Sequence, residues 1–182
     1  MKNLKRKTIV IFGSGDLQSG SPDYQQAYDL GKMLAESGYS IANGGYGGTM
    51  AGAAQGAAEN RPSPDSCTIT GVTCDAFGRN GPNSWIDKEI RTKTLNERLD
   101  ALVNLADAYI VLPGSSGTLL EIALVWELIN KHFLPLRPII FLSEYWKPVI
   151  DTVVQAGEAD TDYLVFADTL DQLKNVLNDC LN

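Results

Sequence analysis

Residues 108–128 read AYIVLPGSSGTLLEIALVWEL: an apolar run, a turn rich in glycine and serine, and a longer, nearly uncharged segment. This order is typical of a buried strand that leads through a turn into a helix. Short β-branched runs alternate with longer helical patterns along the rest of the chain. Strands that are apolar throughout and alternate with helices predict a parallel sheet covered by helices on both faces.

The expected strands lie at Thr8–Phe12, Tyr39–Ala42, Cys67–Thr73, Ala108–Leu112, Pro138–Leu142 and Tyr163–Phe166. The expected helices lie at Tyr24–Ser37, Thr49–Glu59, Leu95–Ala106, Thr118–His132, Trp146–Ala156 and Leu170–Leu181. Asp75–Trp85 has no periodicity and is predicted to be a long loop and a candidate lid. The predicted fold class is α/β, a Rossmann-like doubly wound parallel sheet in three layers. The length of 182 residues favours a single nucleotide-binding domain over residues 1–182.

The charge and cysteine content restrict the partners. A net charge of −7 argues against a nucleic-acid polymer, which is bound by arrays of Lys and Arg. Cys67, Cys74 and Cys180 lack metal-ligand spacing, and His132 is the one histidine, so reduced thiols, a cytoplasmic location and no metal site are expected. No apolar run has the length of a signal-peptide core or a membrane span, so no membrane partner is expected.

Three glycine-rich turns follow predicted strands: GSG at 13–15, NGGYGGT at 43–49 and PGSSGT at 113–118. In doubly wound sheets, ligands bind beyond the carboxyl ends of the strands, and free N–H groups at a helix start can hold a phosphate. We therefore expect these turns to bind a nucleotide, although each could also serve only as a tight turn. The candidate binding residues are Gly13, Ser14, Gly44, Gly45, Gly47, Gly48, Thr49, Gly114, Ser115, Ser116, Gly117 and Thr118.

The sequence lacks the motifs that bind dinucleotides, nucleoside triphosphates or pyridoxal cofactors. Gln18 stands at the third glycine position of the dinucleotide fingerprint, and the sequence contains no Gly-Lys-Ser/Thr of a P-loop. No lysine lies in a glycine-rich turn, where a pyridoxal cofactor would need one. No cofactor is therefore expected.

Glu121 and Arg98 are the candidate catalytic residues. Glu121 has the spacing of a capping box with Thr118, and on a helical wheel it also lies on an apolar face. A carboxylate in such surroundings, one turn from a phosphate-type loop, is suited to exchange protons. Arg98 falls away from the polar face of its helix, so it either follows the core edge or turns towards the crevice to bind a carboxylate or a phosphate.

The stretches NGGYGGTMAGAAQGA (43–57), NER (96–98) and PGSSGTLLEIALVWEL (113–128) resemble the LOG family, which includes cytokinin-activating nucleoside 5′-monophosphate phosphoribohydrolases. The resemblance extends from Thr8 to about Leu177. The family signature PGGxGTxxE falls on 113–121. The resemblance places the family's essential Arg and Glu at Arg98 and Glu121, and it adds Met50 to the candidate binding residues.

The resemblance implies a homodimer that cleaves the N-glycosidic bond of AMP or an N6-modified AMP, giving the free base and ribose 5-phosphate. On this hypothesis Gly114–Thr118 hold the 5′-phosphate, Glu121 lies near the ribose, and Arg98 orients Glu121 or binds the phosphate. Ser115, Asn96 and Leu99 replace a Gly, a His and a Lys of the family pattern. Two alternatives therefore stay open: a non-catalytic carrier of a phosphorylated ligand, such as a nucleotide or the molybdenum cofactor, and a nucleoside deoxyribosyltransferase-like enzyme.

Overall fold

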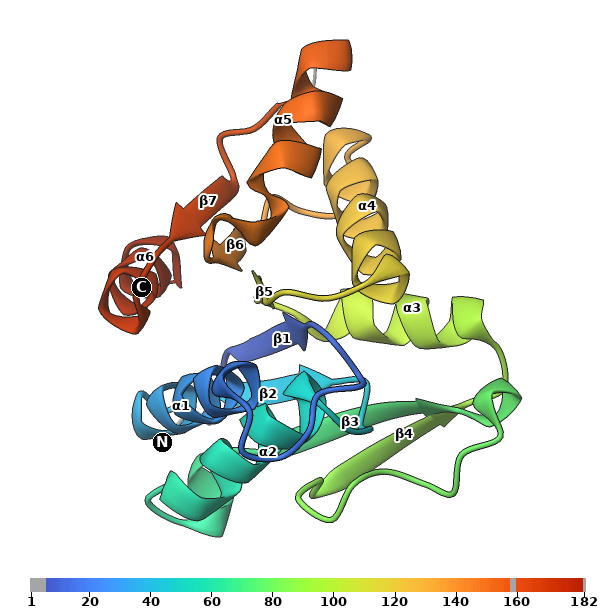
Figure 1. Cartoon of the computed structure of the whole chain (residues 1–182), viewed down its shortest axis with the longest axis vertical. Coiled ribbons are helices and arrows are strands. Elements are labelled where there is room, and N and C mark those ends of the chain that lie inside the picture. Colours follow the sequence, from blue (N-terminus) through green and yellow to red (C-terminus); the bar gives the residue numbers. More distant parts are fainter. Residues whose placement is uncertain (1–5, 158–159, 182) are drawn as a thin grey trace.

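The computed structural model describes residues 6–157 and 160–181. Within this part of the chain, seven strands form one sheet in which every neighbouring pair is parallel. Their order across the sheet (Figure 1) is β4 (Lys88–Thr92), β3 (Ile69–Cys74), β2 (Ser40–Asn43), β1 (Thr8–Phe12), β5 (Ala108–Val111), β6 (Ile139–Leu142) and β7 (Leu164–Ala167). The strand order reverses between β1 and β5, which confirms the predicted doubly wound sheet.

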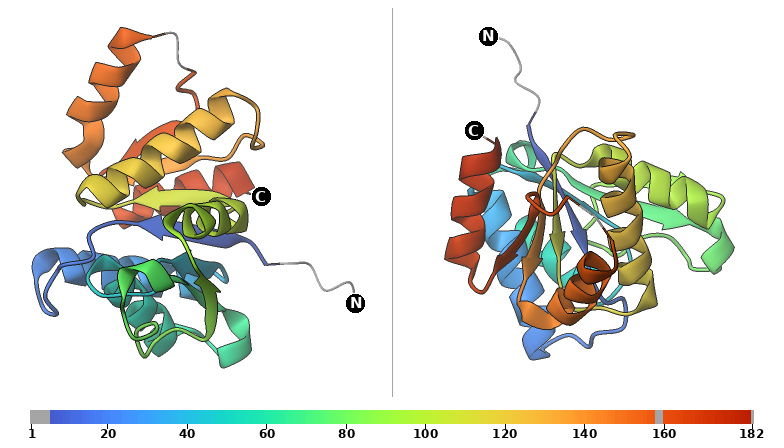
Figure 2. Two further views of the ribbon diagram at one scale, coloured as in Figure 1. Left: turned by 90° about the vertical axis from the view of Figure 1, so that its right-hand side faces the viewer. Right: turned by 90° about the horizontal axis from the view of Figure 1, so that it is seen from above.

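Six helices cover the two faces of this sheet in the described residues: α1 (Pro22–Glu36), α2 (Thr49–Asn60), α3 (Leu95–Leu105), α4 (Ser116–Asn130), α5 (Lys147–Ala156) and α6 (Leu170–Leu181). Ile9 and Ile11 of β1 pack in the core under α1, α2 and α6, whereas Val10 and Phe12 pack under α3, α4 and α5. Successive strand side chains point to opposite faces, so this one strand contributes to both cores. Figure 2 shows the three layers, with helices on either face of the sheet. None of the described helices is both long and apolar enough to cross a membrane.

The predicted strands and helices all occur, with ends displaced by no more than about two residues. The earlier start of α4 changes the position of Thr118 in this helix. This helix begins at Ser116 with Ser115 as its N-cap, two residues before the expected start. Thr118 therefore lies inside the helix and is not the cap of a capping box with Glu121.

β4 is a strand that the sequence did not predict. Its residues, KEIRT, carry mostly charged side chains that are exposed, and only Thr92 is buried. The strand lies at the edge of the sheet, where charged side chains discourage pairing with another chain. An edge strand of this kind has no apolar periodicity that could reveal it.

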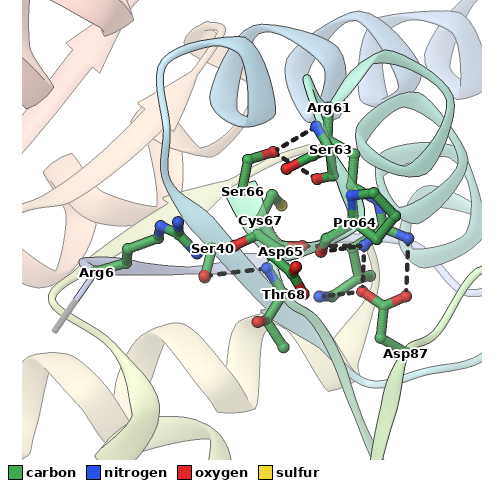
Figure 3. Close-up of polar contacts among 11 residues, drawn as sticks. Arg6, Ser40, Arg61, Ser63, Pro64, Asp65, Ser66, Cys67, Thr68 and Asp87 are labelled. Carbon is green, nitrogen blue, oxygen red and sulfur yellow. Dashed lines mark hydrogen bonds and ion pairs between the residues drawn. The ribbon is translucent and has the colours of Figure 1, made fainter. Parts of the chain in front are cut away.

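A polar cluster ties β4 to the rest of the sheet at the amino ends of β3 and β4 (Figure 3). The Arg61 guanidinium, directly after α2, donates to both Asp87 carboxylate oxygens, at 2.5 and 3.0 Å. Asp87 also accepts the Ile69 N–H at 2.9 Å, and Arg61 donates to the Cys67 carbonyl at 3.0 Å. The cluster therefore fixes the edge of the sheet at the end opposite to the carboxyl ends of the strands.

Candidate functional site

The three glycine-rich turns meet where the strand order reverses. The Ser14 N–H, after β1, donates to the Pro113 carbonyl after β5 at 3.1 Å. The Ser14 carbonyl accepts the Thr49 N–H at the start of α2, at 2.8 Å. Gly48 has a φ of +60°, and a Cβ there would lie 2.3 Å from the Ser14 carbonyl oxygen. Glycine at this position therefore allows the first and second turns to pack backbone against backbone.

A cavity of about 270 Å³ lies at this junction. It is lined by eight of the residues predicted from the sequence: Gly13, Gly44, Met50, Arg98, Ser115, Gly117, Thr118 and Glu121. The remaining predicted residues belong to the same turns but do not line it: Ser14, Gly45, Gly47, Gly48, Thr49, Gly114 and Ser116. Ser14, Gly48 and Thr49 instead join the turns to one another through the contacts described above.

Several lining residues were not predicted. Phe77 and Arg79 come from the loop between β3 and β4, within the segment proposed as a lid. Tyr46 lies inside the second glycine-rich turn, and Leu95 and Leu120 come from the first turns of α3 and α4. The sequence indicated that turn 43–49 and the loop Asp75–Trp85 lie near the ligand, but no pattern in it singled out the side chains of Tyr46, Phe77 and Arg79.

Arg98 and Glu121 form a buried ion pair in the cavity wall. The Arg98 Nη1 lies 3.2 Å from the Glu121 Oε1, and the residues are only 7% and 9% exposed. The Arg98 Nε donates to the Val72 carbonyl of β3 at 3.0 Å. The Glu121 carboxylate thus faces Arg98 and not a backbone N–H at the start of α4, so the capping-box interpretation is wrong.

The start of α3 determines where Arg98 points. Thr94 is the N-cap and accepts the Glu97 N–H at 3.2 Å, while the Glu97 carboxylate accepts the Lys93 N–H at 2.7 Å. Such reciprocal capping fixes the first turn of a helix. The next residue, Arg98, therefore has a defined direction towards β3 and the cavity.

Gly44 provides the space for the Arg98 guanidinium. A Cβ on Gly44 would lie 1.9 Å from the Arg98 Nη2 and 2.7 Å from the Met50 Sδ. The second glycine-rich turn therefore approaches the ion pair with its backbone, as a glycine permits. The Arg98 Cζ also lies 5.6 Å from the centroid of the Phe77 ring, within the range of a cation–π contact.

Near neutral pH, the Glu121 carboxyl is present in both its protonated and its ionised form. Burial raises the pKa of Glu121 from its ordinary value of 4.5 to about 7, although the charge and hydrogen bond of Arg98 act in the opposite direction. The desolvation of a carboxylate in an apolar wall disfavours its charged form. A group with such a pKa can take up or release a proton near neutral pH, as acid–base chemistry requires.

The first turn of α4 is open to an anion. Ser115, Ser116 and Gly117 are exposed, and the Ser115 side chain makes no capping bond. Within residues 6–157 and 160–181, no carbonyl or side chain accepts the N–H groups of Ser116, Gly117 or Thr118. Free N–H groups and the positive end of the helix dipole make such a start an anion-binding position.

The second glycine-rich turn is not open in this way. The Gly45 N–H donates to the Asn43 side-chain oxygen at 2.8 Å, and the Thr49 N–H donates to the Ser14 carbonyl. The N–H groups of Gly45 and Thr49 are therefore not free to bind a phosphate, and the prediction that this turn binds a nucleotide rests on its other residues, of which Gly44 lines the cavity. The protein's own polar atoms use them to hold the turn against Ser14 and the end of β2.

Gly44→Ala tests whether the ion pair needs this close approach. The new methyl group would displace the Arg98 guanidinium from Glu121 and Val72, so we expect the free energy of unfolding to fall by about 2 to 4 kcal/mol. Urea denaturation measures this fall. Gly117→Ala is the matched control because a Cβ there meets no atom of the described residues within 4 Å, and its stability should stay the same or rise by up to about 1 kcal/mol. Equal stability of the two variants would contradict a fixed Arg98.

Comparison with known proteins identifies the relatives of this chain. The model of the SLOG cluster4 family matches residues 6–172. An uncharacterised protein of Archaeoglobus fulgidus is 30% identical over 142 residues, which cover 77% of this chain and 86% of that protein. A cytokinin riboside 5′-monophosphate phosphoribohydrolase of Rhodococcoides fascians is 24% identical over 157 residues, which cover 83% of this chain and 76% of that protein.

Solved structures confirm the fold. The molybdenum cofactor binding protein of Rippkaea orientalis superposes with a TM-score of 0.77 at 21% identity, over 98% of this chain and 99% of that protein. A likeness at this identity shows the three-layer architecture and not the ligand. The family match spans nearly all of the described residues, including the cavity and its ion pair. The chain therefore belongs to the SLOG cluster4 family.

Proposed function

We propose that this protein is a nucleoside 5′-monophosphate phosphoribohydrolase, which cleaves the N-glycosidic bond of AMP or an N6-modified AMP. The observation that carries the proposal is the position of Glu121, a buried carboxylate with a pKa of about 7 in the wall of the cavity. It lies one turn beyond the open start of α4. The similarity to the R. fascians enzyme supports the same reaction class.

The proposed mechanism follows from the direction of α4. The N–H groups of Ser116, Gly117 and Thr118 bind the 5′-phosphate. Glu121 lies three residues past Thr118, a rise of about 5 Å along the helix, which suits contact with the ribose. Loss of the base builds positive charge at the anomeric carbon, and an ionised Glu121 stabilises that charge or removes a proton from the attacking water. Water gives its hydroxyl group to the sugar, and the base leaves with the bonding electrons and takes up a proton.

The rim of the cavity is suited to the base. Phe77, Leu95 and Leu120 line the cavity and remain 43%, 38% and 42% exposed. A cavity of about 270 Å³ lies just below the usual size range of small-molecule sites, so the ribose 5-phosphate would fill much of it. The base would then lie against this apolar rim, which suits a planar ring and an apolar N6 substituent.

A carrier of a phosphorylated ligand is the second candidate. Leu99 lines the cavity at the position where the LOG pattern has a Lys, so the wall lacks one cation of that pattern. The open start of α4 would serve a carrier as well as an enzyme. The name of the R. orientalis protein is consistent with such a role. Release of adenine from AMP separates the two candidates directly.

Glu121→Gln tests the catalytic role. Gln resembles the neutral acid in shape, so the variant should melt within about 2 °C of the wild type at pH 4.5, where Glu121 of the folded protein is protonated. At pH 8 the release of adenine from AMP should fall by about two to four orders of magnitude, because the amide supplies neither negative charge nor a base. Chromatography of free adenine measures the rate. Turnover at the wild-type rate would exclude Glu121 from the chemistry.

The pH dependence of rate and stability should report the same group. The pKa of Glu121 in the folded protein lies above 4.5, the ordinary value that applies to the unfolded chain. The contribution of Glu121 to stability is therefore complete below pH 4.5 and is lost as the pH rises through 7. Relative to Glu121→Gln, the wild type should lose up to about 3 kcal/mol over this range, measured by urea denaturation. Its kcat/KM on AMP should rise about tenfold per pH unit and level off above about pH 7. The same pH dependence of stability in both proteins would contradict this assignment.

We also propose that the protein is a homodimer. A groove of about 780 Å³ between α4 and α5 is lined by the exposed apolar side chains of Leu119, Val149 and Val153. Unpaired apolar surface of this kind favours association. Sedimentation should give twice the chain mass of 19.7 kDa for the wild type and for Lys174→Glu on α6, a control on the other face of the sheet. Val153→Glu should sediment as a monomer, and a monomeric wild type would contradict the proposal.

A further inference from the structure

The cavity wall has few charged side chains. They are Asp16, Arg79, Arg98 and Glu121. Arg98 is bound to Glu121 and to the Val72 carbonyl, so its charge is already offset. Without Arg79, the wall would present two acidic side chains and one basic side chain to an incoming anion. The whole chain, with a net charge of −7, adds to this repulsion.

Arg79 differs from the neighbouring arginine. Arg91 of β4 is bound to Asp75 at 2.5 Å. In the described part of the chain no carboxylate lies within ion-pair distance of Arg79, and its guanidinium carbon is 4.9 Å from the centroid of the Tyr46 ring. A cation held on an aromatic face keeps its N–H donors available at the ring edge. Among the described residues, Arg79 is therefore the cation of the cavity wall that has no acidic partner.

The loop that carries Arg79 is attached to the rim of the cavity. The Asn83 N–H donates to the Gly45 carbonyl at 2.7 Å, and the Asn83 side chain donates to the Tyr46 carbonyl at 2.8 Å. Gly78, with a φ of +63°, ends the short turn Asp75–Phe77 and reverses the chain before Arg79. These contacts attach the loop that carries Arg79 to the second glycine-rich turn, which carries Tyr46.

We propose that Arg79 binds the phosphate of the ligand and supplies the positive charge that the rest of the cavity lacks. The inference rests on the proposed function for the identity of the ligand as a phosphate monoester. A compact cavity of this volume is about 8 Å across, which does not exceed the Debye length at physiological ionic strength. The charge of Arg79 therefore acts on a phosphate bound at the start of α4. Arg79, on the loop between β3 and β4, thus supplies the positive charge that the LOG pattern has as a Lys at the position of Leu99 on α3.

Binding measurements without turnover test this role. In a Glu121→Gln background, calorimetry compares AMP, adenosine and inorganic phosphate as ligands. Arg79→Gln should weaken AMP and phosphate binding by about 10- to 100-fold, as expected for one charge-assisted contact, and leave adenosine binding unchanged. Arg79→Lys should recover part of the loss because it keeps the charge. Arg91→Gln, the matched control, should bind all three ligands as the background protein does.

The outcomes separate this inference from the proposed function. Equal AMP affinity with and without Arg79→Gln would overturn the role of Arg79, whether or not the protein with Glu121 hydrolyses AMP. An equal loss for AMP and adenosine would also overturn it, because Arg79 would then only support the rim through Tyr46. If AMP binds in an Arg79-dependent way but the protein with Glu121 releases no adenine, hydrolysis is excluded and the Arg79 site stands. A protein that binds none of the ligands would overturn both.

Discussion

The buried pair of Arg98 and Glu121 constrains the whole site. It joins α3 to α4 across the point where the strand order reverses, and its bond to the Val72 carbonyl ties both helices to β3. Removing two charges from water costs several kcal/mol for each ion, and the pair regains this only with good geometry and further hydrogen bonds. The Val72 carbonyl and the absence of a side chain on Gly44 meet these requirements. The helix positions, the second turn and the pair therefore depend on one another.

The glycine-rich turns after β2 and β5 look alike in the sequence but have different roles. The turn after β2 uses the N–H groups of Gly45 and Thr49 internally and so becomes a rigid support for Arg98 and Tyr46. The turn after β5 leaves the N–H groups of Ser116 and Gly117 without an acceptor among the described residues, so it remains available to an anion. Both turns are rich in glycine, but for different reasons: the first needs close backbone packing, and the second needs an approachable helix start.

Local patterns in the sequence were sufficient for the fold and for part of the site. Apolar runs followed by glycine-rich turns gave the strand–helix units, and their parallel arrangement brought Glu121 and the start of α4 to one edge. The sequence left open whether Glu121 pairs with Arg98 or caps α4, because Thr118 and Glu121 have the spacing of a capping box. β4 and the placement of Arg79 escaped prediction because they depend on long-range contacts, including those of Asn83 and Asp87. Such contacts leave no periodicity in the sequence.

The ion pair also bears on the choice between an enzyme and a carrier. Binding a phosphate requires the start of α4 and a nearby cation, and neither task needs an ionisable group at Glu121. Buried ion pairs add little stability and can often be replaced by apolar side chains of similar volume without loss. A carboxylate whose pKa burial raises to about 7, facing the cavity and held by Arg98, is thus costly for a protein that only binds its ligand. Such a carboxylate suits the proposed reaction, in which charge would develop on a sugar bound beside it, so the burial of Glu121 supports the proposal of an enzyme over that of a carrier.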